Sequence, residues 1–256
     1  MKLYAERVKN LDWAAKTTWE VEDHAYEPKR KVHNRGSTNY PHLIGSFYST
    51  KNLRPVEYES LNERMFYYFL EVDIGVIRYY VQPIRVRMKT DDDEWYHVPD
   101  VLVFRQGYCP LLYQIKESEQ DNLEPKTVLC NTECEAIAIA YGWNYNVVFP
   151  KSLPSPLPRN VNLMAGYLRT RKYYSDWQDQ VINRLRNIGP CTVDQLSSSF
   201  IDSVDPLHIK PLVFHLMAKG NFLVDVTQTI NSNSVININP EMKSVFSIIE
   251  SREGYI

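Results

Sequence analysis

The sequence predicts an α/β protein with two domains, on the basis of three observations. Over the first 150 residues, runs of β-forming residues alternate with apolar patterns of helical period. Four prolines then fall within residues 150–158, and the chain beyond them contains helical patterns followed by a hairpin pattern. Of the 256 residues, 44% are hydrophobic, which is enough for packed cores and argues against disorder over most of the length.

The first part of the chain predicts an N-terminal arm, a strand and a helix. Residues 1–26 mix aromatic residues with charges, and we expect an arm with a short helix, without an assigned function. Residues 44–48 have the composition of a short strand. The apolar stripe that follows has spacings of three and four residues, which predicts a helix. Its members are Leu61, Met65, Phe66, Phe69 and Leu70.

The remaining elements of the first domain, residues 27–150, follow from strand runs and turns. Residues 76–89 have strand composition interrupted at Pro83, which fits an edge position or a bulge. Residues 90–94, TDDDE, lie between two strand runs, so we interpret them as a solvated hairpin turn rather than an acidic metal cluster. Strands at 101–104, 111–116 and 145–149 and a helix at 133–141 complete the domain.

Polar residues gather where these elements begin or end. Asp100 precedes a strand run, so we expect its carboxylate at the entry to the sheet, free of the core. Gln114 and Lys116 are two residues apart on a strand and therefore share a face. Glu63 lies beside the helical stripe. Two carboxylates, an amide oxygen and an ammonium group suit a hard cation such as Mg²⁺.

A site of this kind hydrolyses phosphodiesters through a metal-bound hydroxide. Lys116 is then expected to orient the attacking water or to neutralise the phosphate. The alternative interpretation is two strand ends with solvated polar side chains, because the dipeptide Pro-Asp and the tripeptide Gln-x-Lys also arise by chance. Glu63 in the preceding helix favours the nuclease interpretation.

Together these motifs resemble the TnsA endonuclease subunit of heteromeric cut-and-paste transposases. The resemblance rests on residues 44–86, on HVPDVLVF at 97–104 and on LYQIKES at 112–118, and it covers residues 28–150 closely. It implies a restriction-endonuclease-like (PD-(D/E)xK) core that nicks double-stranded DNA at the 5′ ends of a transposon, with Mg²⁺ or Mn²⁺ as cofactor. It also implies two protein partners, a TnsB-like transposase subunit that cuts the 3′ ends and a TnsC-like ATPase regulator.

The resemblance also assigns the site residues. The implied catalytic residues are Glu63, Asp100, Gln114 and Lys116. The implied metal ligands are Glu63, Asp100, Gln114 and Ile115. Gln114 stands where ordinary restriction enzymes have an acid, which removes one negative charge and lowers the metal affinity expected of the isolated chain. Glu59, one helical turn before Glu63, is the competitor for the role of Glu63.

The net charge of −2 does not indicate a nucleic-acid binder, but the distribution of charge does. Basic residues concentrate in two segments, residues 27–54 and 78–89, which together contain one acid, Glu27. A positive surface beside an acidic site suits DNA, because phosphate contacts supply most of the non-specific affinity. The alternative is a solvated basic surface. The residues expected to bind DNA are Lys29, Arg30, Lys31, Arg35, Lys51, Arg54, Arg85 and Arg87.

Cysteine usage and hydropathy point to a reducing compartment. Cys130 and Cys134 are one helical turn apart, but no second pair completes a zinc set, so the four cysteines are expected to be reduced structural thiols. The sequence has no apolar leader and no run of eighteen apolar residues. We therefore expect a soluble cytoplasmic protein without a membrane partner. The resemblance to TnsA implies a bacterial protein that is associated with the nucleoid when active.

The prolines at 150–158 predict a stiff extended linker over residues 151–160, with a second domain at 161–256. Helices are expected at about 162–168, at 177–188, from a capping box at Thr192 and Gln195 through Phe200, and at 210–219. In the last of these, Pro211 is expected in the first turn and Gly220 as the stop. Strands at 221–227 and 234–239 then form a hairpin.

The last three of these helices and the hairpin form a winged-helix pattern. From Asp176 onward, six Lys or Arg face nine Asp or Glu, and the hairpin region 221–239 has no basic residue. A protein-docking role is therefore favoured over duplex reading. Two alternatives to a transposase subunit stay open for the whole chain. One is a stand-alone restriction or repair nuclease, and the other is a catalytically silent DNA-binding scaffold.

Overall fold

The structure is a computed structural model that describes residues 11–30, 43–91 and 93–242. Its chain forms two compact units. Among the described residues, the first contains 11–30, 43–66 and Gly75–Ser152, and the second contains Tyr67–Ile74 and 153–242. Both units combine helices with sheets, so the predicted α/β class is confirmed. None of the helices in the described ranges is long and apolar enough to span a membrane.

A mixed four-stranded sheet forms the centre of the first unit. Its strands, in spatial order, are β3 (Val76–Val81), β6 (Val101–Arg105), β7 (Leu111–Ile115) and β8 (Asn144–Val148). β6 pairs antiparallel with both β3 and β7, whereas β8 pairs parallel with β7. A parallel pair needs a crossover, which α4 (Pro125–Tyr141) provides after the short η3 (Asp121–Leu123).

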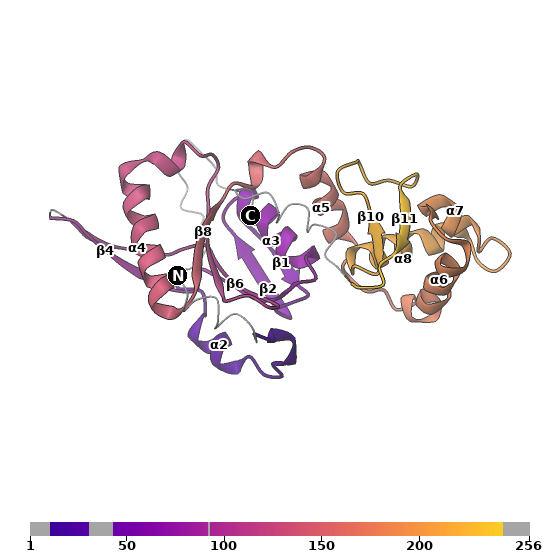
Figure 1. The fold of residues 1–256 in the computed structure, drawn as a ribbon, viewed down its shortest axis with the longest axis horizontal. Coiled ribbons are helices and arrows are strands. Elements are labelled where there is room, and N and C mark those ends of the chain that lie inside the picture. Colours follow the sequence, from indigo (N-terminus) through magenta and orange to yellow (C-terminus); the bar gives the residue numbers. More distant parts are fainter. Residues whose placement is uncertain (1–10, 31–42, 92, 243–256) are drawn as a thin grey trace. The chain divides into compact units, whose positions relative to one another are not determined.

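Helices cover both faces of this sheet (Figure 1). Ala138 of α4 packs in one core cluster with Leu112. Successive side chains of a strand point to opposite faces, so Tyr113 serves the other face, where its ring contacts Phe66 of α3 (Leu61–Val72) at 5.1 Å. Phe66, Phe69 and Leu70 are buried as predicted, but Leu61 is 47% exposed because it begins the helix.

The unit contains two further hairpins. β1 (Gly45–Ser49) and β2 (Arg54–Tyr58) precede the sheet in the sequence, and β4 (Val86–Lys89) and β5 (Glu94–His97) lie between β3 and β6. The predicted turn between β4 and β5 is confirmed by the Thr90 N–H, which donates to the Asp93 carbonyl at 2.9 Å. Residue 92 lies outside the described residues. Pro83 lies between β3 and β4, and β3 is an edge strand, as the proline predicted. The register shift in β3 lies at Val76 and Arg78, away from Pro83.

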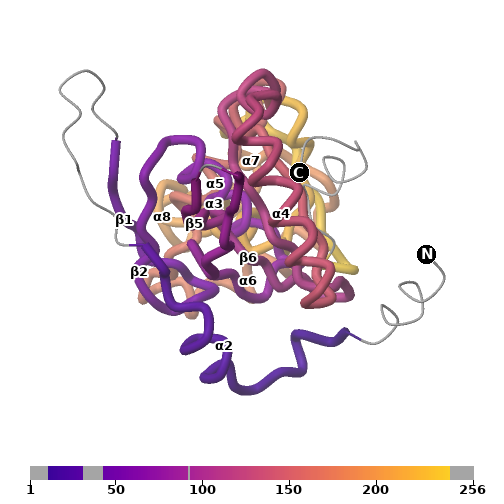
Figure 2. The backbone as a smooth tube through the Cα atoms, turned by 90° about the vertical axis from the view of Figure 1, so that its left-hand side faces the viewer, coloured from indigo at the N-terminus to yellow at the C-terminus, as the bar shows by residue number. Residues whose placement is uncertain are grey.

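The N-terminal strap, residues 11–30, packs against the sheet rather than forming a free arm. It contains η2 (Trp13–Ala15) and α2 (Glu20–Ala25), and Figure 2 shows it crossing the lower edge of the unit. Trp13 and Trp19 contact the ring of Phe104 edge-on, at 4.9 and 5.1 Å. Burial of these large aromatic surfaces stabilises the strap against β6.

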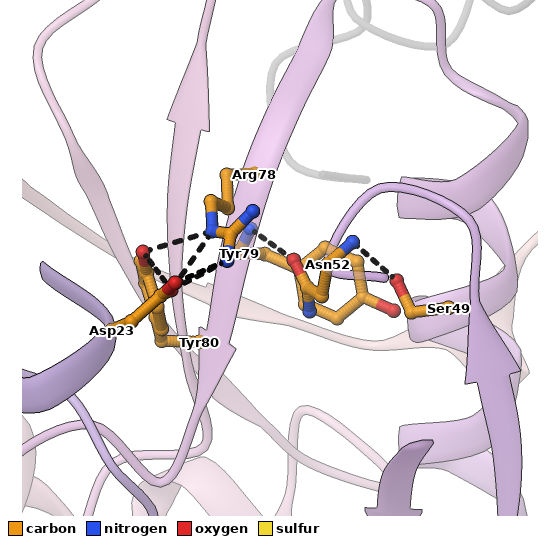
Figure 3. Close-up of polar contacts among 6 residues, drawn as sticks. All are labelled: Asp23, Ser49, Asn52, Arg78, Tyr79 and Tyr80. Atoms are coloured by element: carbon orange, nitrogen blue, oxygen red, sulfur yellow. Dashed lines mark hydrogen bonds and ion pairs between the residues drawn. The ribbon is translucent and has the colours of Figure 1, made fainter. Parts of the chain in front are cut away.

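A polar network ties the strap to β3 (Figure 3). The Asp23 carboxylate accepts hydrogen bonds from the Arg78 guanidinium at 2.6 Å and from the Tyr80 hydroxyl at 2.9 Å. On the next residue of β3, the Tyr79 N–H donates to the Asn52 side chain at 3.2 Å. The Arg78 and Tyr80 donors hold the pKa of Asp23 below its ordinary value, although burial opposes them.

Over residues 153–242, the second unit contains four helices and a three-stranded antiparallel sheet of order β10-β11-β9. The elements are α5 (Leu157–Gly166), α6 (Tyr174–Ile188), β9 (Cys191–Thr192), α7 (Val193–Ser198), α8 (Pro206–Ala218), β10 (Phe222–Val224) and β11 (Val235–Ile238). The predicted capping box at Thr192 and Gln195 is confirmed. α8 begins at Pro206, capped by Asp205, so Pro211 lies inside the helix and not in its first turn.

The prediction of an extended proline linker is wrong. Pro150 begins a short 3-10 helix, η4 (Pro150–Ser152), and Pro158 lies in the first turn of α5. The fixed φ of proline suits the first turn of a helix as well as an extended chain, so composition alone did not separate the two.

Close contacts explain why residue 220 is a glycine and how the loop between β10 and β11 is held. At Gly220, where φ is +78°, a Cβ atom would lie 2.8 Å from Cγ2 of Ile74, which belongs to the same unit. The buried Asn160 side chain of α5 donates to the carbonyls of Val226 and Gln228, both at 2.8 Å. It also accepts the Ile230 N–H at 3.0 Å. Asn160 therefore fixes the loop between β10 and β11.

Candidate active site

Asp100 is held rigidly where β6 begins. Its N–H donates to the Tyr113 carbonyl at 3.0 Å, and its carbonyl accepts the Gln82 N–H at 2.8 Å. Its carboxylate accepts the Ile115 N–H at 2.6 Å. The residue is only 8% exposed, so the expectation of a carboxylate free of the core is wrong. The neighbouring strand β7 covers the carboxylate and supplies its donor.

Gln114 and His97 extend the contacts of Asp100 into a hydrogen-bonded chain. The Gln114 amide nitrogen donates to Oδ2 of Asp100. The Gln114 amide oxygen lies 2.7 Å from Nε2 of His97, and because a carbonyl oxygen only accepts, the imidazole is the donor. The order of donation is therefore His97 to Gln114 to Asp100. In this arrangement the oxygen predicted to bind a cation accepts from His97 instead.

Glu63 lies in the first turn of α3 and also caps that helix. Its carboxylate accepts the Glu59 N–H at 2.8 Å and the Ser60 hydroxyl at 3.3 Å, while its own N–H donates to Ser60 at 3.1 Å. This reciprocal pairing is a variant of the capping box, which satisfies N–H groups that a helix start leaves without partners. The sequence Ser-x-x-Glu at 60–63 is therefore a structural signal as well as a chemical one.

Glu63 and Asp100 are electrostatically coupled. Burial and the charge of Glu63 together raise the pKa of Asp100 to about 7, against the Ile115 N–H and the charges of Lys116 and Arg30, which lower it. Burial also raises the pKa of Glu63. Two carboxylates that resist ionisation together gain from a cation placed between them. The sequence separated these residues by a helix and three strands, and the structure brings their charges together.

Two cations act on the same carboxylates. Lys116, half-buried just after β7, donates its N–H to the Val148 carbonyl at 2.9 Å, and its charge lowers the pKa of Asp100. The charge of Arg30 also lowers the pKa of Asp100 and of Glu63. The Arg30 guanidinium forms an ion pair with Glu59. Glu59 precedes α3, pairs with Arg30 and donates its N–H to Glu63. Its contacts therefore position Glu63 and Arg30.

The site fits a magnesium-like cation in part. Within the described ranges, no three side chains among His, Cys, Asp and Glu come together as a metal-binding group. Mg²⁺ needs less, because it retains waters and binds one or two protein carboxylates plus substrate phosphate. Glu63 and Asp100 are the two carboxylates of this site that could serve as such ligands. Cys130 and Cys134 are buried free thiols whose pKa burial raises, so both remain protonated structural residues near neutral pH.

The basic residues predicted to bind DNA have varied surroundings. Lys31 and Arg35 lie outside the described residues. Arg87 forms a two-armed ion pair with Glu94, both arms at 2.7 Å. The other contacts are with the body of the first unit: Arg85 donates to the Lys29 carbonyl, Lys29 to the Ala25 carbonyl, Lys51 to the Val76 carbonyl, and Arg54 lies over the Tyr80 ring. Their proposed role on DNA stays a prediction.

Sequence reasoning missed His97. Its signal was its position three residues before Asp100, at the end of a strand that pairs with β4. Burial lowers the pKa of His97, as do the charges of Lys116 and Arg30, although the hydrogen bond to Gln114 raises it; the neutral imidazole therefore prevails at neutral pH. The tertiary pairing with Gln114 had no signature in the sequence, because its partner is seventeen residues away.

Comparisons with known proteins complete the description of the site. A scan of the chain against protein-family models gives no matching model, and a search among curated proteins gives no matching sequence. The resemblance to TnsA stays a prediction.

Proposed function

We propose that the chain is a metal-dependent DNA endonuclease. The observation that carries this proposal is the electrostatic coupling of Asp100 with both Glu63 and Lys116. These residues come from the start of β6, the start of α3 and the end of β7, and together they form two carboxylates beside an ammonium group. A structural ion pair alone does not require a second buried acid next to Asp100.

Each residue has a defined part in this proposal. Glu63 and Asp100 would hold a magnesium or manganese ion. When bound, such an ion lowers the pKa of a water molecule and stabilises charge that develops on phosphate. Lys116 neutralises the scissile phosphate or orients the attacking water, and Arg30 adds a second positive charge at the same place. The Ile115 N–H fixes the Asp100 carboxylate from the neighbouring strand.

The biological setting is inferred from the second unit and from the resemblance. α6, β9, α7, α8 and the β10-β11 hairpin follow in the order of a winged helix. The excess of acids from Asp176 onward disfavours contact with duplex DNA and favours a protein partner. A nicking subunit that works with a TnsB-like transposase and a TnsC-like ATPase on transposon ends agrees with both features.

Strand-specific cleavage tests the proposal. A duplex carrying a transposon end, labelled on each strand in turn, is incubated with Mg²⁺ and the chain, with and without the transposase and the ATPase. We expect a nick at the 5′ end that requires the partners and disappears in Asp100→Ala. Cleavage by Asp100→Ala at the wild-type level would contradict the site.

The same experiment separates the alternatives. Asp100-dependent cleavage by the chain alone, without partners, would identify a stand-alone nuclease. Normal complex formation without any nick would identify a silent scaffold. The hydrogen bond between the Gln114 amide oxygen and His97 favours this alternative over the stand-alone nuclease, because that oxygen was the predicted metal ligand.

A further inference from the structure

Gln114 is the polar residue whose chemistry in the structure differs from its predicted role. The residue is only 5% exposed and lies at the end of β7, hydrogen-bonded to His97 and Asp100. The amide nitrogen faces the Asp100 carboxylate, and the amide oxygen faces Nε2 of His97 at 2.7 Å. Both hydrogen bonds in the series His97, Gln114 and Asp100 thus pair a donor with an acceptor.

The reversed amide would fail at both ends. Its oxygen would face Oδ2 of the ionised Asp100 carboxylate, so that two acceptors oppose each other, and its nitrogen would face the Nε2–H of His97, so that two donors oppose each other. A buried polar atom without a partner costs roughly 1–3 kcal/mol. With His97 in the Nε2–H form, the described orientation is the one that satisfies all three residues.

We propose that Gln114 is a positioning residue rather than a cation ligand: His97 fixes its amide, and the amide nitrogen fixes the Asp100 carboxylate. This inference rests on the proposed cation site. The Ile115 N–H and the Gln114 amide both reach Oδ2 of Asp100, which sets the rotation of the carboxylate and leaves Oδ1 to bind the cation. Glutamine rather than glutamate then has a reason, because a third carboxylate could not donate to Asp100.

The first test measures the imidazole of His97 directly. Wild-type protein labelled with ¹⁵N-histidine is titrated with Mg²⁺ at pH 8, and the His97 signals are assigned by their loss in His97→Gln. We expect a protonated Nε2 and an unprotonated Nδ1 before and after Mg²⁺ is added. If Mg²⁺ moves the proton to Nδ1, then Gln114 has rotated to bind the cation through its oxygen, and the inference is overturned.

The second test measures Mn²⁺ binding by the decrease of the electron paramagnetic resonance signal of free Mn²⁺. His97→Leu removes the Nε2–H donor that fixes the Gln114 amide. We expect the Kd for Mn²⁺ to rise roughly five- to tenfold in this variant. His97→Gln carries an N–H at similar reach and is expected to restore wild-type affinity. Thermal unfolding of both variants checks that they are folded.

The outcomes separate this inference from the proposed function. Equal Mn²⁺ binding by wild type and His97→Leu would overturn the positioning role alone. Equal binding by wild type and Asp100→Asn, or no binding by wild type, would overturn the cation site and the inference with it.

Discussion

The charge of Glu63 raises the pKa of Asp100, although 37 residues separate the two in the sequence. Glu63 sits at the start of a helix that it also caps, and Asp100 sits at the start of a strand that buries it. The fold thus keeps two acids close at a place where neither is well solvated. Stability and cation binding are therefore expected to oppose each other at this site, and the predictions below separate the two.

The stability of the chain is expected to fall as pH rises between about 4 and 7. The pKa of Asp100 rises from 3.8 to about 7 on folding, so the folded state holds this proton more tightly than the unfolded state. The contribution of Asp100 is full below about pH 4 and is lost as pH rises through about 7, with an upper limit on the order of 4 kcal/mol.

Asp100→Asn removes this titration but keeps an oxygen that accepts from Ile115. Without divalent cations, the free energy of unfolding of the variant is expected to exceed that of wild type at pH 8, and the difference is expected to shrink at pH 5. Urea unfolding at both pH values measures it. A difference independent of pH would show that Asp100 titrates as in the unfolded chain.

Ser60→Ala and Glu63→Gln are expected to separate the two roles of Glu63. Ser60→Ala removes the hydroxyl cap of α3 and is expected to lower the free energy of unfolding by about 1 kcal/mol. Glu63→Gln retains an oxygen that accepts from Glu59 but loses the charge beside Asp100. We expect this variant to remain nearly as stable as wild type and to lose Mg²⁺-dependent nicking. Full nicking by folded Glu63→Gln would remove Glu63 from the site.

Lys116→Met is expected to reduce nicking at least about a hundredfold while Mn²⁺ still binds, because the lost ammonium acts on phosphate and not on the metal. The matched control is Lys151→Met, since Lys151 is an exposed lysine paired with Glu117. Single-turnover cleavage and Mn²⁺ binding are compared for both variants. Equal loss in the two would point to general electrostatic attraction of DNA rather than to the site.

Asn160→Asp is expected to destabilise the second unit by roughly 3 kcal/mol, because two buried carbonyls would lose their donors and face a carboxylate. Asn162→Asp on the same helix is the control, since Asn162 is exposed and is expected to change stability by less than about 0.5 kcal/mol. Urea unfolding compares them. Similar small losses in both would mean that the loop 226–230 does not depend on Asn160.

Local patterns in the sequence determined the α/β class, the β4-β5 hairpin and the capping box at Thr192. These features depend on side-chain period and turn chemistry within a few residues, which the sequence displays directly. The chemical types at Glu63, Asp100 and Lys116 were also visible, because strand ends place polar side chains at predictable points.

Only the tertiary structure decided what surrounds those side chains. Pairing of β6 with β7 buried Asp100, which a strand entry by itself does not imply. The tertiary structure also joined His97 to Gln114 and placed Tyr67–Ile74 with the second unit. Pro150 and Pro158 lie in the first turns of helices because the φ angle of proline suits either state. Burial, charge coupling and hydrogen-bond direction depend on partners distant in the chain, and no local pattern specifies them.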